Sequence, residues 1–350
     1  MRAPTYSMPI NKVLVAILML GTIFAVTFYL VWMRSWGPRH GQVNHDLGTY
    51  AWKKDLPLPR TEAGGTSLQG KFYVVGGIDS LAQTFSDLQV YDPALDSWNR
   101  LADFPRPINH PGVVADDHFL YSVGGFGPLG IRVRGFMFAR WDPYDQLERF
   151  DPAANRWTSL ARMPSPRGAG GVTLGGGKIW YVGGIDPERN LSKQLFAYEI
   201  ATNTWEEMPP MKYARDHMRL EYYEGAIYAI SGRRDDMRFN LGHVEKFDIA
   251  TRTWTKLPPI PTPRGGFGSA VLDGKIYTFG GESVWTCFDT VEALNLSTET
   301  WEAFPALPEA RHGIIAGTIG NSIHLISGGR HPRVSISGLH RTFSPAKREQ

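Results

Sequence analysis

The sequence predicts an all-β fold in which six units of four short strands pack around a ring. Two series of residues predict this fold. In the first, a pair of small residues ending in glycine closes six apolar, β-like runs, at residues 76–77, 124–125, 183–184, 231–232, 280–281 and 328–329. In the second, six tryptophans recur in step with these pairs: Trp52, Trp98, Trp157, Trp205, Trp254 and Trp301. Each pair begins 24 to 27 residues after its tryptophan, which indicates a structural repeat.

The chain begins with a short tail, residues 1–12, followed by an apolar segment without charge, Val13 to Met33. As a helix, these 21 residues would be roughly 31 Å long, which matches the hydrocarbon thickness of a bilayer. A cleaved signal peptide has a shorter apolar core and a small-residue cleavage site, which this segment lacks. A buried core helix is also disfavoured, because the segment is apolar on every face. We therefore expect a transmembrane signal anchor.

Residues 34–48 form the polar linker that follows, with several glycines and no periodicity. The flanking positive charges are nearly balanced, so they do not set the orientation of the anchor. A short tail before one apolar run is the usual form of a signal anchor, however. We therefore expect a single-pass membrane protein whose C-terminal part lies outside the cytoplasm.

The region from residue 49 to 346 holds the repeats, and 347–350 is a short tail. In the third unit, the runs GGVTL, KIWYVGG, KQLFAYEI and TWEEMPP are rich in aromatic and β-branched residues and are separated by turns. Such a unit cannot bury both faces alone, so neighbouring units must pack face to face in a ring. One loop, between Gly125 and Trp157, is lengthened by about eleven residues.

The repeats resemble the Kelch family. The Gly-Gly doublet, the aromatic-Asp-Pro of YDPALDSW (91–98) and FDPAANRW (150–157), and the tryptophan beyond it carry the resemblance. It implies a β-propeller, and the number of repeats implies six blades. The last repeat ends without a tryptophan, in residues 340–346, while Thr49 to Pro59 reads as an orphan fourth strand. We therefore expect this N-terminal strand to complete the last blade and close the ring, which would also remove exposed sheet edges.

Composition and motifs exclude several classes of protein. The chain has 350 residues, one cysteine and a net charge of +3. This composition argues against a disordered chain, a disulfide framework, a cysteine-based zinc site and nucleic-acid binding. No dinucleotide, phosphate-loop or hydrolase motif stands in a suitable context, and the histidines show no metal-ligand spacing. We expect no cofactor and no metal, and the absence of catalytic motifs favours a protein that is not an enzyme.

Arginines recur in one register, ten residues after the tryptophan and just before each innermost strand. They are Arg167, Arg215, Arg264 and Arg311, with Arg60 in register after a two-residue deletion. Ile108 occupies the remaining position, and His110, His217 and His312 lie one or two residues beyond the ring of arginines. A propeller would bring these positions together around one mouth of its channel. Guanidiniums suit carboxylates or phosphates, so the register predicts a basic ligand site.

The loops after the glycine pairs should form the rim of the same mouth. Their basic and aromatic residues are Arg132, Arg134, Arg140, Trp141, Arg233, Trp285 and Arg330. Two alternatives remain open: these loop residues are simply solvated, or the ring arginines hold blades together. In the second case, the acidic residues after the pairs, Asp79, Asp186, Asp235, Asp236 and Glu282, would be their partners.

Three functions follow from these residues. The first is a membrane-tethered scaffold that binds a protein partner or an acidic ligand, peptide or sugar, at the arginine-ringed mouth. The resemblance supports it, because Kelch domains that bind acidic peptides use arginines at channel mouths. The alternative is an epimerase or mutarotase of an acidic sugar, similar to a bacterial Kelch enzyme that epimerises sialic acid, with a His or Glu moving protons. The third is a purely structural or assembly role.

Overall fold

The computed structural model describes residues 47–134 and 136–346, except for the side chains of 131–140. The predicted anchor, 13–33, and the tails 1–12 and 347–350 lie outside these residues, as does most of the linker. Within the described part of the chain, we find no helix with the length and hydropathy needed to cross a bilayer.

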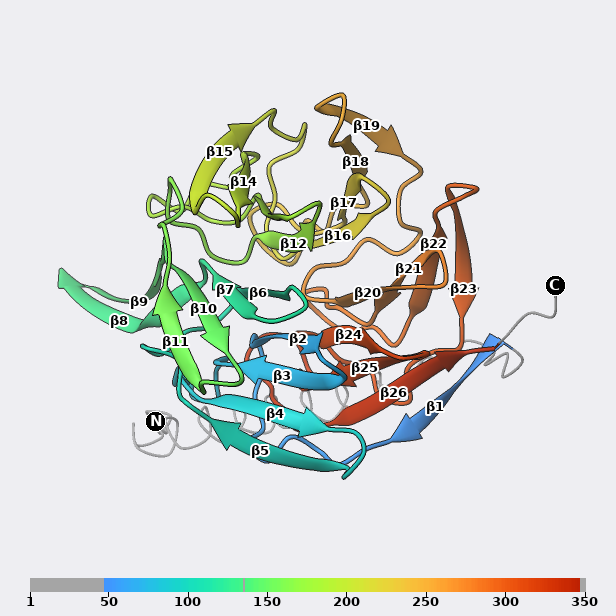
Figure 1. The fold of residues 1–350 in the computed structure, drawn as a ribbon, viewed down its shortest axis with the longest axis horizontal. Coiled ribbons are helices and arrows are strands. Elements are labelled where there is room, and N and C mark those ends of the chain that lie inside the picture. Colours follow the sequence, from blue (N-terminus) through green and yellow to red (C-terminus); the bar gives the residue numbers. More distant parts are fainter. Residues whose placement is uncertain (1–46, 135, 347–350) are drawn as a thin grey trace, which may run out of the picture. The chain divides into compact units, whose positions relative to one another are not determined.

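The described residues form six four-stranded antiparallel sheets, each a blade of a propeller (Figure 1). From the axis outward, blades 1 to 3 are β2(Gly64–Leu68), β3(Lys71–Val75), β4(Leu88–Asp92), β5(Ser97–Leu101); β6(Gly112–Ala115), β7(Leu120–Val123), β10(Leu147–Asp151), β11(Arg156–Ser159); and β12(Gly171–Gly175), β13(Lys178–Val182), β14(Leu195–Glu199), β15(Thr204–Met208). Blades 4 to 6 are β16(Arg219–Tyr223), β17(Ala226–Ile230), β18(Val244–Asp248), β19(Thr253–Leu257); β20(Gly268–Leu272), β21(Lys275–Phe279), β22(Val291–Asn295), β23(Thr300–Phe304); and β24(Ile315–Ile319), β25(Ser322–Ile326), β26(His340–Pro345), β1(Gly48–Trp52). The predicted all-β fold of six four-stranded units is confirmed.

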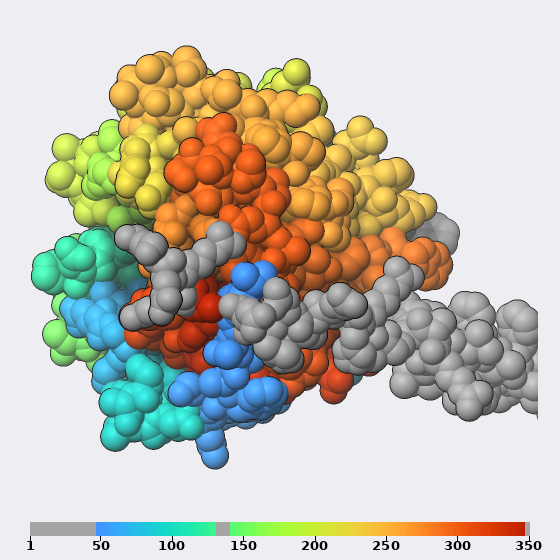
Figure 2. Space-filling model, turned by 90° about the vertical axis from the view of Figure 1, so that its right-hand side faces the viewer, coloured from blue at the N-terminus to red at the C-terminus, as the bar shows by residue number. Residues whose placement is uncertain are grey.

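The N-terminal strand closes the ring, as predicted. β1 pairs antiparallel with β26, from Gly48 opposite Pro345 to Trp52 opposite Arg341. Figure 2 shows the blue N-terminal segment lying against the red C-terminal one. The first and last strands of the propeller therefore belong to one sheet, and their pairing closes the ring.

The tryptophans of the outermost strands connect neighbouring blades. The indole N–H of Trp98 donates to the carbonyl of Lys54 at 2.8 Å, and that of Trp157 donates to Ala102 at 3.0 Å. Trp205, Trp254 and Trp301 make the same bond to the blade before their own. At the sixth position Trp52 is exposed, and the hydroxyl of Tyr50 donates to Pro305 instead, at 2.8 Å. A tyrosine thus completes the series where the closing strand interrupts the repeat.

The glycine pairs allow the blades to approach each other closely. The N–H of the second residue of each pair donates to a carbonyl of the next blade, for example Gly77 to Ile108 at 2.8 Å. A Cβ on the first residue, Gly76, would lie only 2.2 Å from that same carbonyl oxygen. In blade 6 the pair with this role is Ser327 and Gly328, since Gly328 donates to Arg60. The assignment of this pair to residues 328–329 was therefore wrong by one residue.

The long insertion is a hairpin. Residues expected only to lengthen a loop form β8(Phe126–Arg134) and β9(Phe136–Pro143), a two-stranded sheet that projects from blade 2 (Figure 1). Arg132 and Arg134 lie on β8 and Arg140 lies on β9. Their side chains are outside the described part, so their predicted place on the rim stays a prediction.

The innermost strands of all blades line a channel. A cavity of about 310 Å³ runs along it, bordered by residues of β2, β6, β12, β16, β20 and β24. In an antiparallel blade, the connection into the innermost strand and the loop between the second and third strands lie on the same face. We call this the loop face. The arginine register and the predicted rim loops both lie on it.

Candidate functional site

The five arginines of the register are not free at the channel mouth. Arg60, Arg215, Arg264 and Arg311 are 0% exposed, and Arg167 is 6% exposed. A charged side chain is buried this fully only where other groups compensate its charge and its donors. The expected ring of exposed guanidiniums is therefore wrong.

Each arginine is held within its own blade. Arg60 donates to both carboxylate oxygens of Asp87, at 2.8 and 2.7 Å, and to the carbonyl of Gly76 at 2.7 Å. Arg215 pairs with Glu245, and Arg264 pairs with Glu292. These carboxylates lie on or next to the third strand, so the arginine attaches the incoming connection to the blade that it enters. The alternative of a structural role for the arginines is therefore supported, but their partners are not the acidic residues expected after the glycine pairs.

The other two arginines have neutral partners. Arg167 donates to the side-chain oxygen of Gln194 at 2.6 Å, and Arg311 donates to the carbonyls of Ser327 and Leu339 at 2.8 and 3.0 Å. Burial lowers the pKa of Arg311, although the carboxylate of Glu309 opposes the shift. The register is therefore a structural feature of the connections between blades.

A second register lies two residues after the first and surrounds the axis. Its members share a left-handed backbone, with φ from 49° to 64°: Glu62, His110, Ala169, His217, Gly266 and Gly313. The backbone N–H of His110 donates to the carbonyl of Glu62 at 2.7 Å, and that of His217 donates to the carbonyl of Ala169 at 2.8 Å. Gly313 cannot carry a side chain, since a Cβ there would lie 2.2 Å from Thr61 Oγ1 and 3.2 Å from Glu62 Oε1. Three small residues of this register thus leave space for three functional ones.

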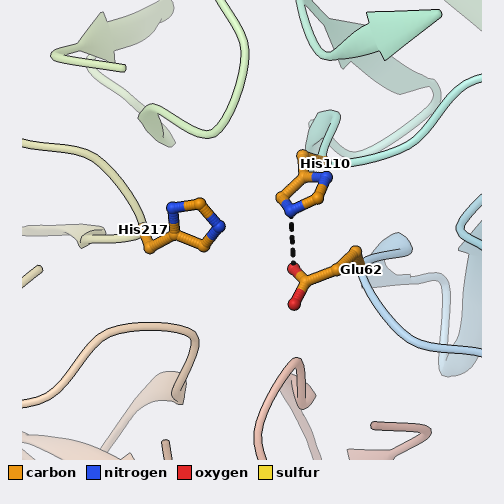
Figure 3. A group of neighbouring side chains, drawn as sticks. All are labelled: Glu62, His110 and His217. Atoms are coloured by element: carbon orange, nitrogen blue, oxygen red, sulfur yellow. Dashed lines mark ion pairs between the residues drawn. The ribbon is translucent and has the colours of Figure 1, made fainter. Parts of the chain in front are cut away.

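Glu62, His110 and His217 point toward one another across the axis (Figure 3). His110 Nε2 lies 3.2 Å from Glu62 Oε2. The two imidazole rings meet edge to face, with their centroids 5.0 Å apart. One ligand atom from each of the three side chains lies within 4.8 Å of the others. All three side chains border the channel cavity, so the chemistry of this axial site faces the channel.

The residue before each histidine orients its ring. Nδ1 of His110 lies 2.7 Å from Asn109 Oδ1, and Nδ1 of His217 lies 2.9 Å from Asp216 Oδ2. The amide nitrogen of Asn109 faces the carbonyl of Gly127 at 3.0 Å, so its oxygen must face His110. Both rings therefore donate from Nδ1 and direct Nε2 away from these partners, His110 toward Glu62.

A wider set of charges surrounds the axial site. His312 Nδ1 lies 3.5 Å from Glu62 and 3.6 Å from Glu282, and Arg233 lies 3.0 Å from Glu282. Burial would raise the pKa of Glu62, but His110, His312 and His217 together hold that pKa well below its usual value. Burial would lower the pKa of His312, but the carboxylates of Glu282 and Glu62 raise it overall. Glu62 is therefore a carboxylate at neutral pH.

Deeper in the channel, Arg219 and Glu221 line the cavity from β16. Arg219 and Glu221 lie two residues apart on the strand, so both side chains point to the same face of the sheet. Arg219 donates to the carbonyls of Phe267 and Ile314, and Ser269 donates to Glu221. Burial raises the pKa of Glu221 to about 7. The channel thus holds a charged interior as well as a charged mouth.

The predicted rim residues differ in their surroundings. Trp285 is 67% exposed and Arg330 is exposed. Arg233 is nearly buried in its ion pair with Glu282, and the ring of Trp141 lies beside His110, with centroids 5.9 Å apart. Trp285 and Arg330 are therefore available to a partner at the surface, whereas Arg233 and Trp141 belong to the surroundings of the axial site.

Sequence reasoning found the three histidines but missed Glu62, Arg219 and Glu221. The structure brings His110 and His217 to the axis and buries His312 beside them. Spacing rules for metal or catalytic residues fail here, because Glu62, His110 and His217 come from three different blades. A signal was present, however, since aligning the units places Glu62 in the same register as both histidines.

Comparisons with known proteins agree with this architecture. A Kelch motif model matches residues 59–105, 166–212 and 263–308. Beta-scruin of Limulus polyphemus is 28% identical over 143 residues, covering 41% of this chain and 15% of that protein. Kelch-like protein terF of Aspergillus terreus is 26% identical over 191 residues, covering 51% and 40%. Alpha-scruin of Limulus polyphemus is 32% identical over 187 residues, covering 51% and 19%. The matched regions span less than half of the length of each of these relatives.

The fold has a counterpart among solved structures. The structure of YjhT superposes with a TM-score of 0.67, covering 81% of this chain and 94% of that one at 16% identity. Such identity speaks for the fold alone. The sequence repeats, the motif matches and the sheet topology agree with one another. The chain therefore carries Kelch repeats, arranged as a six-bladed β-propeller.

Proposed function

We propose that the propeller is a binding scaffold whose loop face docks an acidic segment of a partner protein. One observation carries the proposal. Most of the exposed large apolar side chains in the described residues belong to loops on this face: Leu58, Leu81, Phe239, Trp285 and Val334. The others are Trp52, on the closing strand, and Leu95, in a turn on the opposite face. Apolar side chains gathered on one face are typical of an interaction surface.

Cations accompany these apolar side chains. Arg234 and Arg238 lie on the loop that holds Phe239, and Arg330 and Arg333 lie on the loop that holds Val334. The side chains of Arg234 and Arg238 are 61% and 68% exposed, although each also contacts an aspartate of its own loop. Arginine and large aromatic side chains are both enriched at the energetic centre of protein interfaces. An acidic segment with an apolar anchor fits this surface. The exposed arginines of the loop face, and not the buried arginine register, are therefore the basis for an acidic ligand.

Replacing Trp285 with alanine should weaken peptide binding strongly. An array of acidic peptides screened with the full chain in detergent supplies the probe, and isothermal titration calorimetry measures its affinity. Truncating a central aromatic anchor costs about 2 kcal/mol or more, which is roughly a thirtyfold rise in Kd. Because Trp285 is largely exposed, the melting temperature should hardly change.

Leu95 provides the matched control, since it is 72% exposed on the opposite face. Leu95→Ala should leave the affinity unchanged. Equal affinity of Trp285→Ala and the wild type would place the peptide elsewhere and contradict the loop face as its docking site.

The second part of the proposal is that residues 13–33 tether the propeller to a membrane, with the propeller outside the cytoplasm. The length and apolarity of this segment support it. In sealed vesicles with the cytoplasmic side outward, added protease should leave the propeller intact until detergent opens the membrane. Digestion without detergent would contradict this sidedness. A Leu18→Arg, Ile23→Arg variant should leave the membrane on alkaline washing, since charges at the centre of a span disfavour insertion.

The alternative, an epimerase or mutarotase of an acidic sugar, has less support. It depended on an arginine that clamps the sugar carboxylate, and the arginines of the register are buried, each with hydrogen bonds to its own blade. Glu62, His110 and His217 remain as groups that could move protons. The scaffold therefore stands as the proposed function.

A further inference from the structure

We infer that Glu62, His110 and His217 form a binding site for a divalent transition-metal ion of the zinc type on the propeller axis. The proposal goes beyond the scaffold function, because none of these residues belongs to the docking surface proposed above. It rests on the donor set, on the orientation of both histidines and on a contact between two acceptors that a cation would relieve.

The donor set suits the ion. Two imidazoles and one carboxylate are a recurring combination in zinc sites that keep a position open. Their ligand atoms lie within 4.8 Å of one another. Around a tetrahedral ion with bonds of about 2.1 Å, ligand atoms lie roughly 3.4 Å apart, so the side chains need to move inward by about 1 Å. Ala169, Gly266 and Gly313 occupy the other positions of the ring, and they place no bulky side chain between the ligands.

Both histidines carry the outer support that metal ligands require. A ligating histidine donates its other ring N–H to a carboxylate, carbonyl or similar acceptor, which fixes its tautomer and orientation. Asp216 accepts from Nδ1 of His217, and Asn109 accepts from Nδ1 of His110. The carboxylate and the amide oxygen are both buried. The second nitrogen of each ring, Nε2, is thereby left to bind the ion.

The contact between His110 and Glu62 suits a metal ion bound by both side chains. With its proton on Nδ1, neutral His110 presents a lone pair from Nε2 to a carboxylate oxygen 3.2 Å away. Two acceptors at this distance repel each other unless a proton or a metal ion lies between them. A metal ion bound by both side chains would relieve this repulsion, since each atom would then donate its lone pair to the ion.

His312 and the cavity complete the site. His312 is fully buried, and neither of its ring nitrogens has a hydrogen-bond partner. Its Nδ1 lies 3.5 Å from Glu62 Oε1, so the ring stands beside the carboxylate ligand of the ion. The cavity of about 310 Å³ borders Glu62, His110 and His217, so the open position faces the channel. An anionic or carbonyl group entering the channel would find the ion there.

Metal titration of the full chain in detergent tests the site. After treatment with a chelator, Zn²⁺ is added and followed by calorimetry, and Co²⁺ is added and followed by its visible absorption. The wild type should bind about one ion per chain, with affinity that falls at lower pH because the ligands must lose their protons. His217→Ala and Glu62→Gln should abolish binding. Asp216→Asn, which alters the support of His217 and also the ion pair of Asp216 with Arg233, should weaken binding roughly 10- to 100-fold.

His118 is an exposed histidine in a turn between β6 and β7 and provides the control. His118→Ala should bind zinc as the wild type does. Circular dichroism and thermal melting of each variant without metal show whether it folds, so a loss of binding in a folded Glu62→Gln variant supports the site. A wild type that binds no zinc, or a His217→Ala variant that binds as well as the wild type, would overturn it, whatever the peptide measurements give.

Discussion

Replacing Arg264 with alanine should lower the free energy of unfolding by about 3–5 kcal/mol, because the change leaves the carboxylate of Glu292 buried without its partner. Arg264 is fully buried, donates to Glu292 and also donates to the carbonyls of Gly280 and Thr290, at 2.8 and 2.9 Å. Urea unfolding followed by tryptophan fluorescence and circular dichroism measures the loss. This loss is expected of an arginine with a structural role and not of one that binds a ligand.

Two further variants make the Arg264 test specific. In Arg264→Met, Glu292→Met both charges are removed, and the loss should be smaller than in Arg264→Ala, since no unpaired charge is left inside. Arg100 pairs with Asp103 at the surface, and Arg100→Ala should leave the unfolding transition almost unchanged. If Arg264→Ala unfolded like the wild type, the arginine register would have to be reconsidered as a ligand site.

Replacing Phe343 with alanine should cost about 3–5 kcal/mol of the free energy of unfolding through loss of its packing. Phe343 is fully buried on β26. Its ring lies 5.1 Å from that of Tyr50 on the closing strand, and 5.7 and 6.1 Å from those of Phe279 and Phe304 in blade 5. The residue therefore joins the two chain ends to the neighbouring blade, and its loss should weaken the closure of the ring.

The control for Phe343 is Phe239, which is 43% exposed on the loop face. Phe239→Ala should change the free energy of unfolding little, since it opens no cavity. Phe343→Leu, which keeps most of the volume, should lie between the wild type and Phe343→Ala. Equal stability of Phe343→Ala and the wild type would show that the closing blade does not limit the stability of the propeller.

Much of the fold could be predicted from the sequence because the repeat is encoded by backbone needs. Gly76 must be small since a Cβ would strike the carbonyl of Ile108, and Trp98 must reach Lys54 in the sheet before its own. Such requirements recur in every blade and leave a periodic signal. The β8–β9 hairpin interrupts the period, so the sequence showed only its length and not its strands.

The candidate site was only partly predictable, because a register predicts where a residue lies and not where its side chain points. Arg60 does lie at the loop face, but Asp87, 27 residues later, draws its guanidinium into the blade. A carboxylate 27 to 30 residues after Arg60, Arg215 and Arg264 was a readable signal for burial. Glu62 was missed because single repeats conceal it, while alignment of the repeats places it with His110 and His217.

The most direct test separates the two registers in one measurement: urea unfolding of the wild type, Arg264→Ala and His217→Ala, each with and without Zn²⁺. A ligand at a hundredfold excess over its Kd stabilises the folded state by about 2.7 kcal/mol. We predict that Arg264→Ala is destabilised yet still gains stability from zinc, whereas His217→Ala gains none from zinc, whatever its stability without metal. The reverse pattern, a stable Arg264→Ala and a zinc response that survives in His217→Ala, would contradict the division between structural arginines and a functional axis.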